Sequence, residues 1–392
     1  MNARSLARQL AALSACALLV GPAVQAAPQP SKTLGFVLTG WSTSFYETPL
    51  FDECPEGFAQ GYDETWWLGI SKEDRDRLTN KGTSERTARS GIALRRGPKG
   101  EDVCLNPTAV KDPPMPVVEG KFGYGMNLDG TENGGATAKT CAHKKFETPE
   151  GQKGIDNQMY RLIGCNYGWH PEFGIYDANA NETRRNNGLG MVLFEVSDVD
   201  DAKNDNDVTV TIYRSVDPYI MDSSGDYVPF SSYRIDTLDG KPRYGDKLHG
   251  KIVDGELITE PGDARVPWYG NYTYVSYRAR DFRIKLKVSP DGATAKGMAA
   301  GYFETEQFLH YFLGLGSAHS NGFANCPAFY VAAHELADGY PDPKTGECTA
   351  LSAAYDIKAV AAYIVHPNEV ATTKRERGTL EKLKSLFTKV KG

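Results

Sequence analysis

The chain has 392 residues, a formal net charge of −6 and a hydrophobic fraction of 40%, which is high enough to build a real core. Beyond residues 10–20 no stretch approaches the length of apolar sequence that a bilayer requires, so the sequence excludes a membrane-spanning helix. No basic patch precedes the C-terminal segment, which argues against a nucleic acid as the partner.

The N-terminus is typical of an export signal. Arg4 and Arg8 precede the apolar run of residues 10–20, and small side chains lead up to Ala26. We therefore predict a signal peptide that is cleaved after Ala26, and a secreted or periplasmic protein. The alternative is that Cys16 belongs to a lipoprotein processing site and becomes lipidated, although the apolar stretch before it is very short.

Six cysteines remain after such a cleavage: Cys54, Cys104, Cys141, Cys165, Cys326 and Cys348. An even number in an exported chain predicts three disulfides, because an oxidising compartment keeps such bonds formed. Closeness in sequence favours pairing Cys54 with Cys104, Cys141 with Cys165, and Cys326 with Cys348, although sequence alone allows every other connectivity. A zinc site at Cys141 and His143 is an alternative that lacks a second pair of ligands.

Composition divides the chain into four parts. Residues 1–26 are the signal, 27–114 an irregular N-terminal lobe, 115–367 the main body, and 368–392 a basic tail. The boundary near Pro114 follows a stretch rich in Gly, Arg, Lys and Pro, and consecutive prolines cannot lie in a central strand.

The main body reads as a series of short strands. Residues 188–218 contain two apolar runs joined by an acidic turn, and residues 117–126, 227–235, 248–258 and 272–288 continue the strand pattern. We predict a mainly β fold, an antiparallel β-sandwich or jelly-roll-like body with three disulfides. Helical spacing in residues 303–315 and 328–336, and a helix start at Ser71, add a few peripheral helices.

One predicted strand has two different faces. Apolar residues at 282, 284, 286 and 288 alternate with Arg283, Lys285 and Lys287. This alternation indicates one buried face and one wet, basic face.

The acidic turn of the 188–218 hairpin is a candidate calcium site. Five carboxylates fall within ten residues: Asp198, Asp200, Asp201, Asp205 and Asp207. Calcium takes six to eight oxygen ligands, and a bound cation offsets the repulsion among such charges. The loop is not an EF-hand, because Lys203 stands at the position of the turn glycine, and a solvated acidic turn is the alternative.

A second set of oxygen donors lies on two predicted turns: Asn127, Asp129, Asp156 and Asn157. The set is a second candidate for calcium. Each member is equally well explained as a turn residue whose side chain bonds to its own backbone.

Ligand binding is assigned to aromatic and basic residues of one predicted strand. Tyr272 and Tyr274 project from the same side, and Arg278 follows them along the strand. Flat aromatic rings suit sugar rings, and a guanidinium suits an acidic group. Aromatic residues mostly fill cores, so each taken singly is also a structural candidate.

No catalytic motif emerges: the chain lacks a Gly-x-Ser-x-Gly elbow, a Walker loop and a zincin helix, and the catalytic residues stay unknown. We therefore predict a secreted, calcium-stabilised binding protein for a carbohydrate or another envelope polymer. The first alternative is a polysaccharide hydrolase or lyase that uses two carboxylates from Glu172, Asp177, Glu304 and Glu306. The second is a structural envelope protein.

The last residues form a basic tail with amphipathic spacing. Leu380, Leu383, Phe387 and Val390 fall near one helical face, among several lysines. A peripheral contact with an anionic membrane surface is one expectation, and a loosely docked tail helix is the other.

Overall fold

The structure is a computed structural model that describes residues 32–59, 67, 70–80, 99, 102–111, 114–166, 168–170, 176–187, 191–270, 273–319 and 326–367. The predicted signal peptide, Cys16 and the basic tail lie outside these residues. The expectations for cleavage, lipidation and peripheral membrane contact therefore stay predictions.

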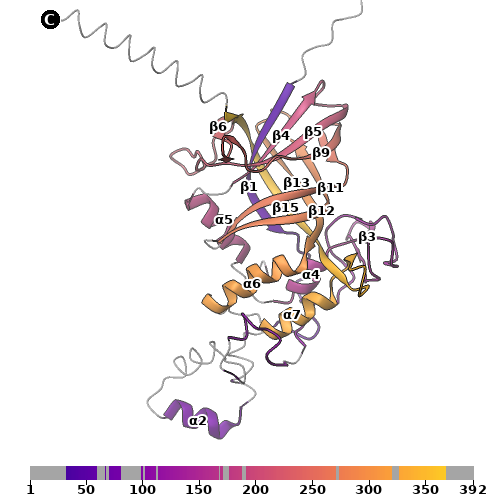
Figure 1. Ribbon diagram of the computed structural model, residues 1–392, viewed down its shortest axis with the longest axis vertical. Helices are drawn as coiled ribbons and strands as arrows, with labels where there is room; N and C mark the ends of the chain where they lie inside the picture. The colour runs from indigo at the N-terminus through magenta and orange to yellow at the C-terminus, as the bar shows by residue number, and fades with distance from the viewer. Residues whose placement is uncertain are drawn as a thin grey trace, which may run out of the picture.

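Eight strands form one sheet that closes on itself (Figure 1). In their order around the ring they are β1 (Lys32–Thr43), β4 (Val192–Val199), β5 (Asp205–Arg214), β9 (Asp246–Val253), β10 (Glu256–Thr259), β12 (Thr273–Val288), β13 (Thr294–Glu304) and β15 (Cys348–Val365). All eight neighbouring pairs are antiparallel.

The first strand closes the ring. Phe36 of β1 lies opposite Phe194 of β4, and Trp41 of β1 lies opposite Ile357 of β15. Closure pairs both sides of every strand in the ring, so no long unpaired edge remains among these eight. The prediction of a mainly β fold with a few helices and three disulfides is confirmed, although the described strands form one closed sheet, and two stacked sheets are not observed.

Residues 32–43, which the sequence analysis assigns to the N-terminal lobe, therefore belong to the main sheet. The division into domains otherwise stays a prediction.

Shorter strands lie outside the ring; some of them pair with its strands, and others form two separate two-stranded sheets. They are β2 (Phe146–Glu147), β3 (Lys153–Ile155), β6 (Ser231–Arg234), β7 (Thr237–Leu238), β8 (Lys241–Pro242), β11 (Gly262–Gly270) and β14 (Gly339–Pro341). β11 pairs with β12 and β14 with β15, both antiparallel, whereas β6 runs parallel to the end of β15. The expected strand at residues 117–126 is wrong, because most of this segment forms no ladder and lies as a loop along the sheet.

The inside of the closed sheet is filled by apolar side chains. Phe194, Val210, Ile284 and Leu286 are each fully buried and belong to one continuous core. Because side chains alternate along a strand, the neighbours of these residues point outward. The predicted alternation along residues 282–288 is confirmed: the apolar members are buried or half-buried, and Lys285 and Lys287 are exposed.

The described residues contain, besides the sheet, the helices α2 (Lys72–Asn80), α4 (Gln158–Ile163), α5 (Tyr176–Asn187), α6 (Thr305–His319) and α7 (Cys326–Glu335). Figure 1 shows α4, α6 and α7 gathered at one end of the sheet. α2 begins as predicted, since the Ser71 hydroxyl accepts a hydrogen bond from the Asp74 N–H at 3.0 Å. Within the described residues, no helix combines the length and apolar character needed to cross a membrane.

The disulfides join Cys54 to Cys165, Cys104 to Cys326 and Cys141 to Cys348. The pairing expected from closeness in sequence is therefore wrong for all six cysteines. Partners lie 111 to 222 residues apart: one bridge joins two loops that both precede β4, and the other two join such loops to α7 and β15. A cross-link over such a long loop removes much conformational freedom from the unfolded chain.

Candidate functional site

An open groove of about 1000 Å³ lies on the outer face of the closed sheet. Its floor comes from β10, β12, β13 and β15, and one wall comes from the loops around residues 124–127 and 148–152. The lining contains five basic side chains (Arg283, Lys285, Lys287, Lys296 and Lys358) and two acidic ones (Glu256 and Asp356). The groove is therefore basic, although the whole chain carries a net negative charge.

The basic side chains point into the groove because of strand alternation. Ile284 and Leu286 face the core of the closed sheet, so Arg283, Lys285 and Lys287 face outward. Lys285 lies 3.9 Å from Glu256 on the neighbouring strand, at the outer limit for an ion pair. Most of the positive charge on this floor is thus not neutralised by the sheet itself.

The wall segment, residues 124–128, is fixed to the sheet by Arg283. Its guanidinium donates hydrogen bonds to the carbonyls of Asn127 at 2.8 Å and Leu128 at 2.6 Å. The Leu128 N–H in turn donates to a carboxylate oxygen of Asp156 at 2.7 Å. A Cβ atom added at Gly125 would lie 2.9 Å from the Asp156 carbonyl oxygen, so the wall approaches this backbone as closely as glycine allows.

A buried ion network, formed by Asp129, His143, Lys145, Asp156 and Asp338, lies behind the wall segment. Lys145 Nζ lies 2.6 Å from Asp129 Oδ1 and 2.5 Å from Asp156 Oδ1. His143 Nε2 lies 2.7 Å from Asp156 Oδ1 and 3.6 Å from Asp338 Oδ2. None of the five side chains is more than 6% exposed.

Burial shifts the ionisation of this network. It raises the pKa of Asp338 to about 7, against the partly compensating charge of His143. Burial opposes the charged form of His143, but the hydrogen bond to Asp156 and the nearby Asp338 raise its pKa overall. The pKa of Asp129 is lowered although burial opposes this, because Lys145 and Thr131 donate hydrogen bonds to the carboxylate.

The second predicted set of oxygen donors is only partly brought together. Asp129 and Asp156 converge, and with His143 they form a group of three potential metal ligands. The Lys145 ammonium already lies between the two carboxylates. The Asn127 side chain bonds within its own turn, and Asn157 accepts a hydrogen bond from the Tyr160 N–H at the start of α4.

The zinc site suggested for Cys141 and His143 is wrong, because Cys141 forms a disulfide with Cys348 and has no free thiol to bind the metal. The same disulfide ties the loop that carries His143 and Lys145 to the last strand. The network therefore acts as an anchor for the groove wall, in which Lys145 and His143 face the buried carboxyl groups.

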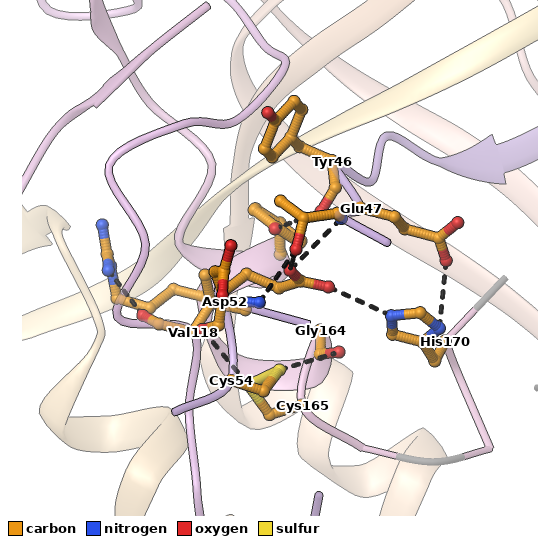
Figure 2. Close-up of a disulfide and its surroundings, with 12 residues drawn as sticks. Tyr46, Glu47, Asp52, Cys54, Val118, Gly164, Cys165 and His170 are labelled. Atoms are coloured by element: carbon orange, nitrogen blue, oxygen red, sulfur yellow. Dashed lines mark hydrogen bonds and ion pairs between the residues drawn. A yellow bond between two sulfur atoms is a disulfide. The ribbon is translucent and has the colours of Figure 1, made fainter. Parts of the chain in front are cut away.

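A second charged cluster lies beside the Cys54–Cys165 disulfide (Figure 2). His170 Nδ1 lies 3.1 Å from Glu47 Oε1, and His170 Nε2 lies 3.2 Å from Glu53 Oε1. Each ring nitrogen therefore faces a carboxylate oxygen. His170 and Glu53 are buried, and the cluster clamps the loop after β1 next to the disulfide.

The predicted calcium loop is an Asp-rich turn whose side chains bond to their own backbone. Asp205 accepts hydrogen bonds from the N–H groups of Asp200, Asp201 and Asp207 at 2.6, 3.3 and 3.1 Å. Asp201 accepts one from the Lys203 N–H at 2.8 Å. All five aspartates lie in the described part of the chain, and they form no converging group of three ligands there.

Of the predicted ligand residues, Tyr274 and Arg278 do not line the groove. Tyr274 is 47% exposed and its ring lies 4.5 Å from that of Tyr269, between centroids. Arg278 donates to Glu304 at 3.3 Å. Tyr272 lies outside the described residues, so a shared aromatic platform with Tyr274 stays a prediction.

The predicted catalytic carboxylates are engaged separately. Glu304 pairs with Arg278 and Arg280, whereas Glu306 lies 3.1 Å from His334 Nε2. Neither lines the groove. Glu172 lies outside the described residues, and the side chain of Asp177 is likewise not described.

Sequence reasoning missed the groove, although one of its signals was visible. The basic face of residues 283–287 was predicted, but nothing in the sequence showed that Lys296 and Lys358 stand beside it. No family model matches the chain, and searches of curated proteins and of solved structures find no match.

Proposed function

We propose that this protein is an exported binding protein that holds a carbohydrate or another envelope polymer in the groove on its outer sheet face. The observation that carries the proposal is the groove itself, an open hollow of about 1000 Å³ beside a wall that is fixed before any ligand arrives. Arg283, the buried ion network and the Cys141–Cys348 disulfide hold that wall. Such preorganisation lowers the entropic cost of binding.

Two carboxyl groups in the lining bear on the catalytic alternative. Glu256 and Asp356 are the two acidic residues of the groove, and Asp356 accepts a hydrogen bond from the Ser44 hydroxyl at 2.9 Å. A glycosidase needs two carboxyl groups across the scissile bond with different protonation states. Burial raises the pKa of Asp356, which suits a general acid, and the hydrolase or lyase alternative stays a prediction.

Hydrogen exchange of the whole mature chain tests the proposal. We expect a bound polysaccharide to slow amide exchange in residues 124–127 and 148–152, because these loops form the wall and few of their amides lie in strands. Protection confined to another face would contradict the assignment of the groove. The chain length of the polymer, measured before and after incubation, tests the hydrolase alternative in the same experiment.

The calcium part of the proposal rests on the composition of the loop at residues 198–207. If the loop binds calcium in the folded state, a chelator lowers Tm and added calcium restores it. The variant Asp201→Asn/Asp207→Asn removes that response. If Tm is the same with chelator, with added calcium and in the double variant, calcium no longer belongs to the proposal.

A further inference from the structure

Three lysines stand in one line across the floor of the groove. Lys287 of β12 lies directly opposite Lys296 of β13, and Lys296 lies directly opposite Lys358 of β15. All three residues are exposed and point away from the core. We call this set the lysine row.

The lysine row adds a small like-charge repulsion to the sheet. Directly opposed residues on antiparallel strands have Cβ atoms about 5 Å apart, and like charges at that distance destabilise the pair. Within the described residues, no acidic side chain forms an ion pair with Lys296 or Lys358, and Lys287 donates to the Asp254 carbonyl. Glu256 faces Lys287 across the strands, but the lysine it contacts is Lys285, at 3.9 Å.

The row does not come from a local run of charge. Its members lie on three strands, and Lys358 is far from the other two in sequence. Only the register of the closed sheet brings these three residues into one line. On β1, the residue opposite Lys358 is Gly40, so no side chain covers the row at that end.

Open space borders the row. Its three lysines line both the groove and a second hollow of about 1130 Å³, which extends toward the turns at residues 201–203 and 288–292. A ligand that lies across the row therefore has room on both sides. A single small anion meets one or two ammonium groups, whereas a chain with an anionic group on each repeat meets all three.

We propose that the lysine row binds an acidic polysaccharide, whose successive carboxylates pair with Lys287, Lys296 and Lys358; this rests on the proposed function of the groove. Neighbouring strands lie about 4.8 Å apart, which spaces the three residues along the row, and their long side chains can adjust to the carboxylates of the polymer. Gln152 and Tyr124 also line the groove and supply an amide and a phenol for the hydroxyl groups of sugars.

The observations favour a polysaccharide over a nucleic acid as the polyanion. Domains that bind nucleic acid usually have a basic overall charge, whereas this chain has a net charge of −6 and a pI of about 5.7. At long range the protein repels a highly charged chain, and attraction begins only close to the row.

The test measures binding of the full mature chain to polygalacturonate, to neutral dextran and to single-stranded DNA by isothermal titration calorimetry. We expect polygalacturonate to bind, with an affinity that falls as salt rises. The variant Lys287→Ala/Lys296→Ala/Lys358→Ala should bind at least about tenfold more weakly, because it loses three charge-assisted contacts at once. Replacing the same three residues with Arg should keep binding.

A matched control removes three exposed lysines from another part of the sheet surface: Lys241→Ala/Lys247→Ala/Lys251→Ala. These residues do not line either hollow, so this variant should bind polygalacturonate as the natural chain does. Equal losses in both triple variants would overturn the proposal, since net charge alone would then explain the binding. Melting curves of both variants check that each remains folded.

The outcomes separate the two proposals. Binding of dextran in the groove with no preference for polygalacturonate would overturn the lysine row and leave the proposed function intact. Binding of neither polymer, nor of any other polysaccharide, would overturn the proposed function itself. Tighter binding of single-stranded DNA than of polygalacturonate would overturn the assignment to an acidic polysaccharide.

Discussion

Two groups of charges on opposite sides of the groove wall behave differently. In the buried ion network, Lys145 lies within 2.6 Å of two carboxylates and His143 within 2.7 Å of one. In the lysine row, three cations face one another in the open. The network uses charge to hold the wall, whereas the row keeps charge available.

Burial and pairing explain the difference. A buried charge without a partner costs several kcal/mol, so each charge of the network has a partner. An exposed charge is screened by water, so a row of like charges costs little and persists when an outside ligand makes use of it. The same residue type therefore has a structural role in the buried network and, in our proposal, a binding role in the row.

The largest expected effect comes from removing the central cation of the network. The variant Lys145→Met leaves Asp129 and Asp156 buried without their ammonium, and it should lower the free energy of unfolding by about 3–5 kcal/mol in urea melts. The neighbouring variant Lys144→Met, on an exposed residue, is the control and should change it by less than about 0.5 kcal/mol. Equal effects would show that the network does not anchor the wall.

Next in size is the covalent anchor of the same wall. Replacing Cys141 and Cys348 together with Ser should lower the free energy of unfolding by about 2–4 kcal/mol, because the bond closes a long loop in the unfolded chain. Amide exchange in residues 124–128 should also accelerate. If that exchange is unchanged, the disulfide stabilises the fold without positioning the groove.

The network should also respond to pH through Asp338. Its pKa is about 7 in the folded state and 3.8 in the reference state, so the folded chain holds this proton more tightly. The stability that this proton contributes is present at pH 5 and is lost as pH rises to 7, a change of about 2 kcal/mol. In Asp338→Asn that part of the slope should be absent, and parallel pH profiles for the two proteins would contradict the assignment.

The smallest expected effect is on the row. Lys296→Ala removes the middle cation and relieves two like-charge contacts, so the free energy of unfolding should stay within about 0.5 kcal/mol of the natural value or rise slightly. Binding of polygalacturonate should fall in the same variant. A marked loss of stability would show that Lys296 has a structural role like that of Lys145, and would contradict the difference drawn between the row and the network.

Local pattern was a good guide to individual elements. The hairpin of β4 and β5, the alternation along β12 and the start of α2 follow from spacing and from the Ser71 cap. The 117–126 segment misled, because its apolar residues pack against the sheet while its backbone lies outside the ladders. The predicted pairing of the cysteines was wrong, because contacts between segments far apart in sequence decide which cysteines lie close in space.

The sequence by itself determined that the chain is mainly β, that six cysteines form three bridges, and that β12 has one basic face. These features depend on composition and on a period of two residues, which the chain carries locally. Only the tertiary structure decided which strands are neighbours. That order forms the groove and aligns Lys287, Lys296 and Lys358. Register arises from the packing of the whole closed core, and no short stretch of sequence contains it.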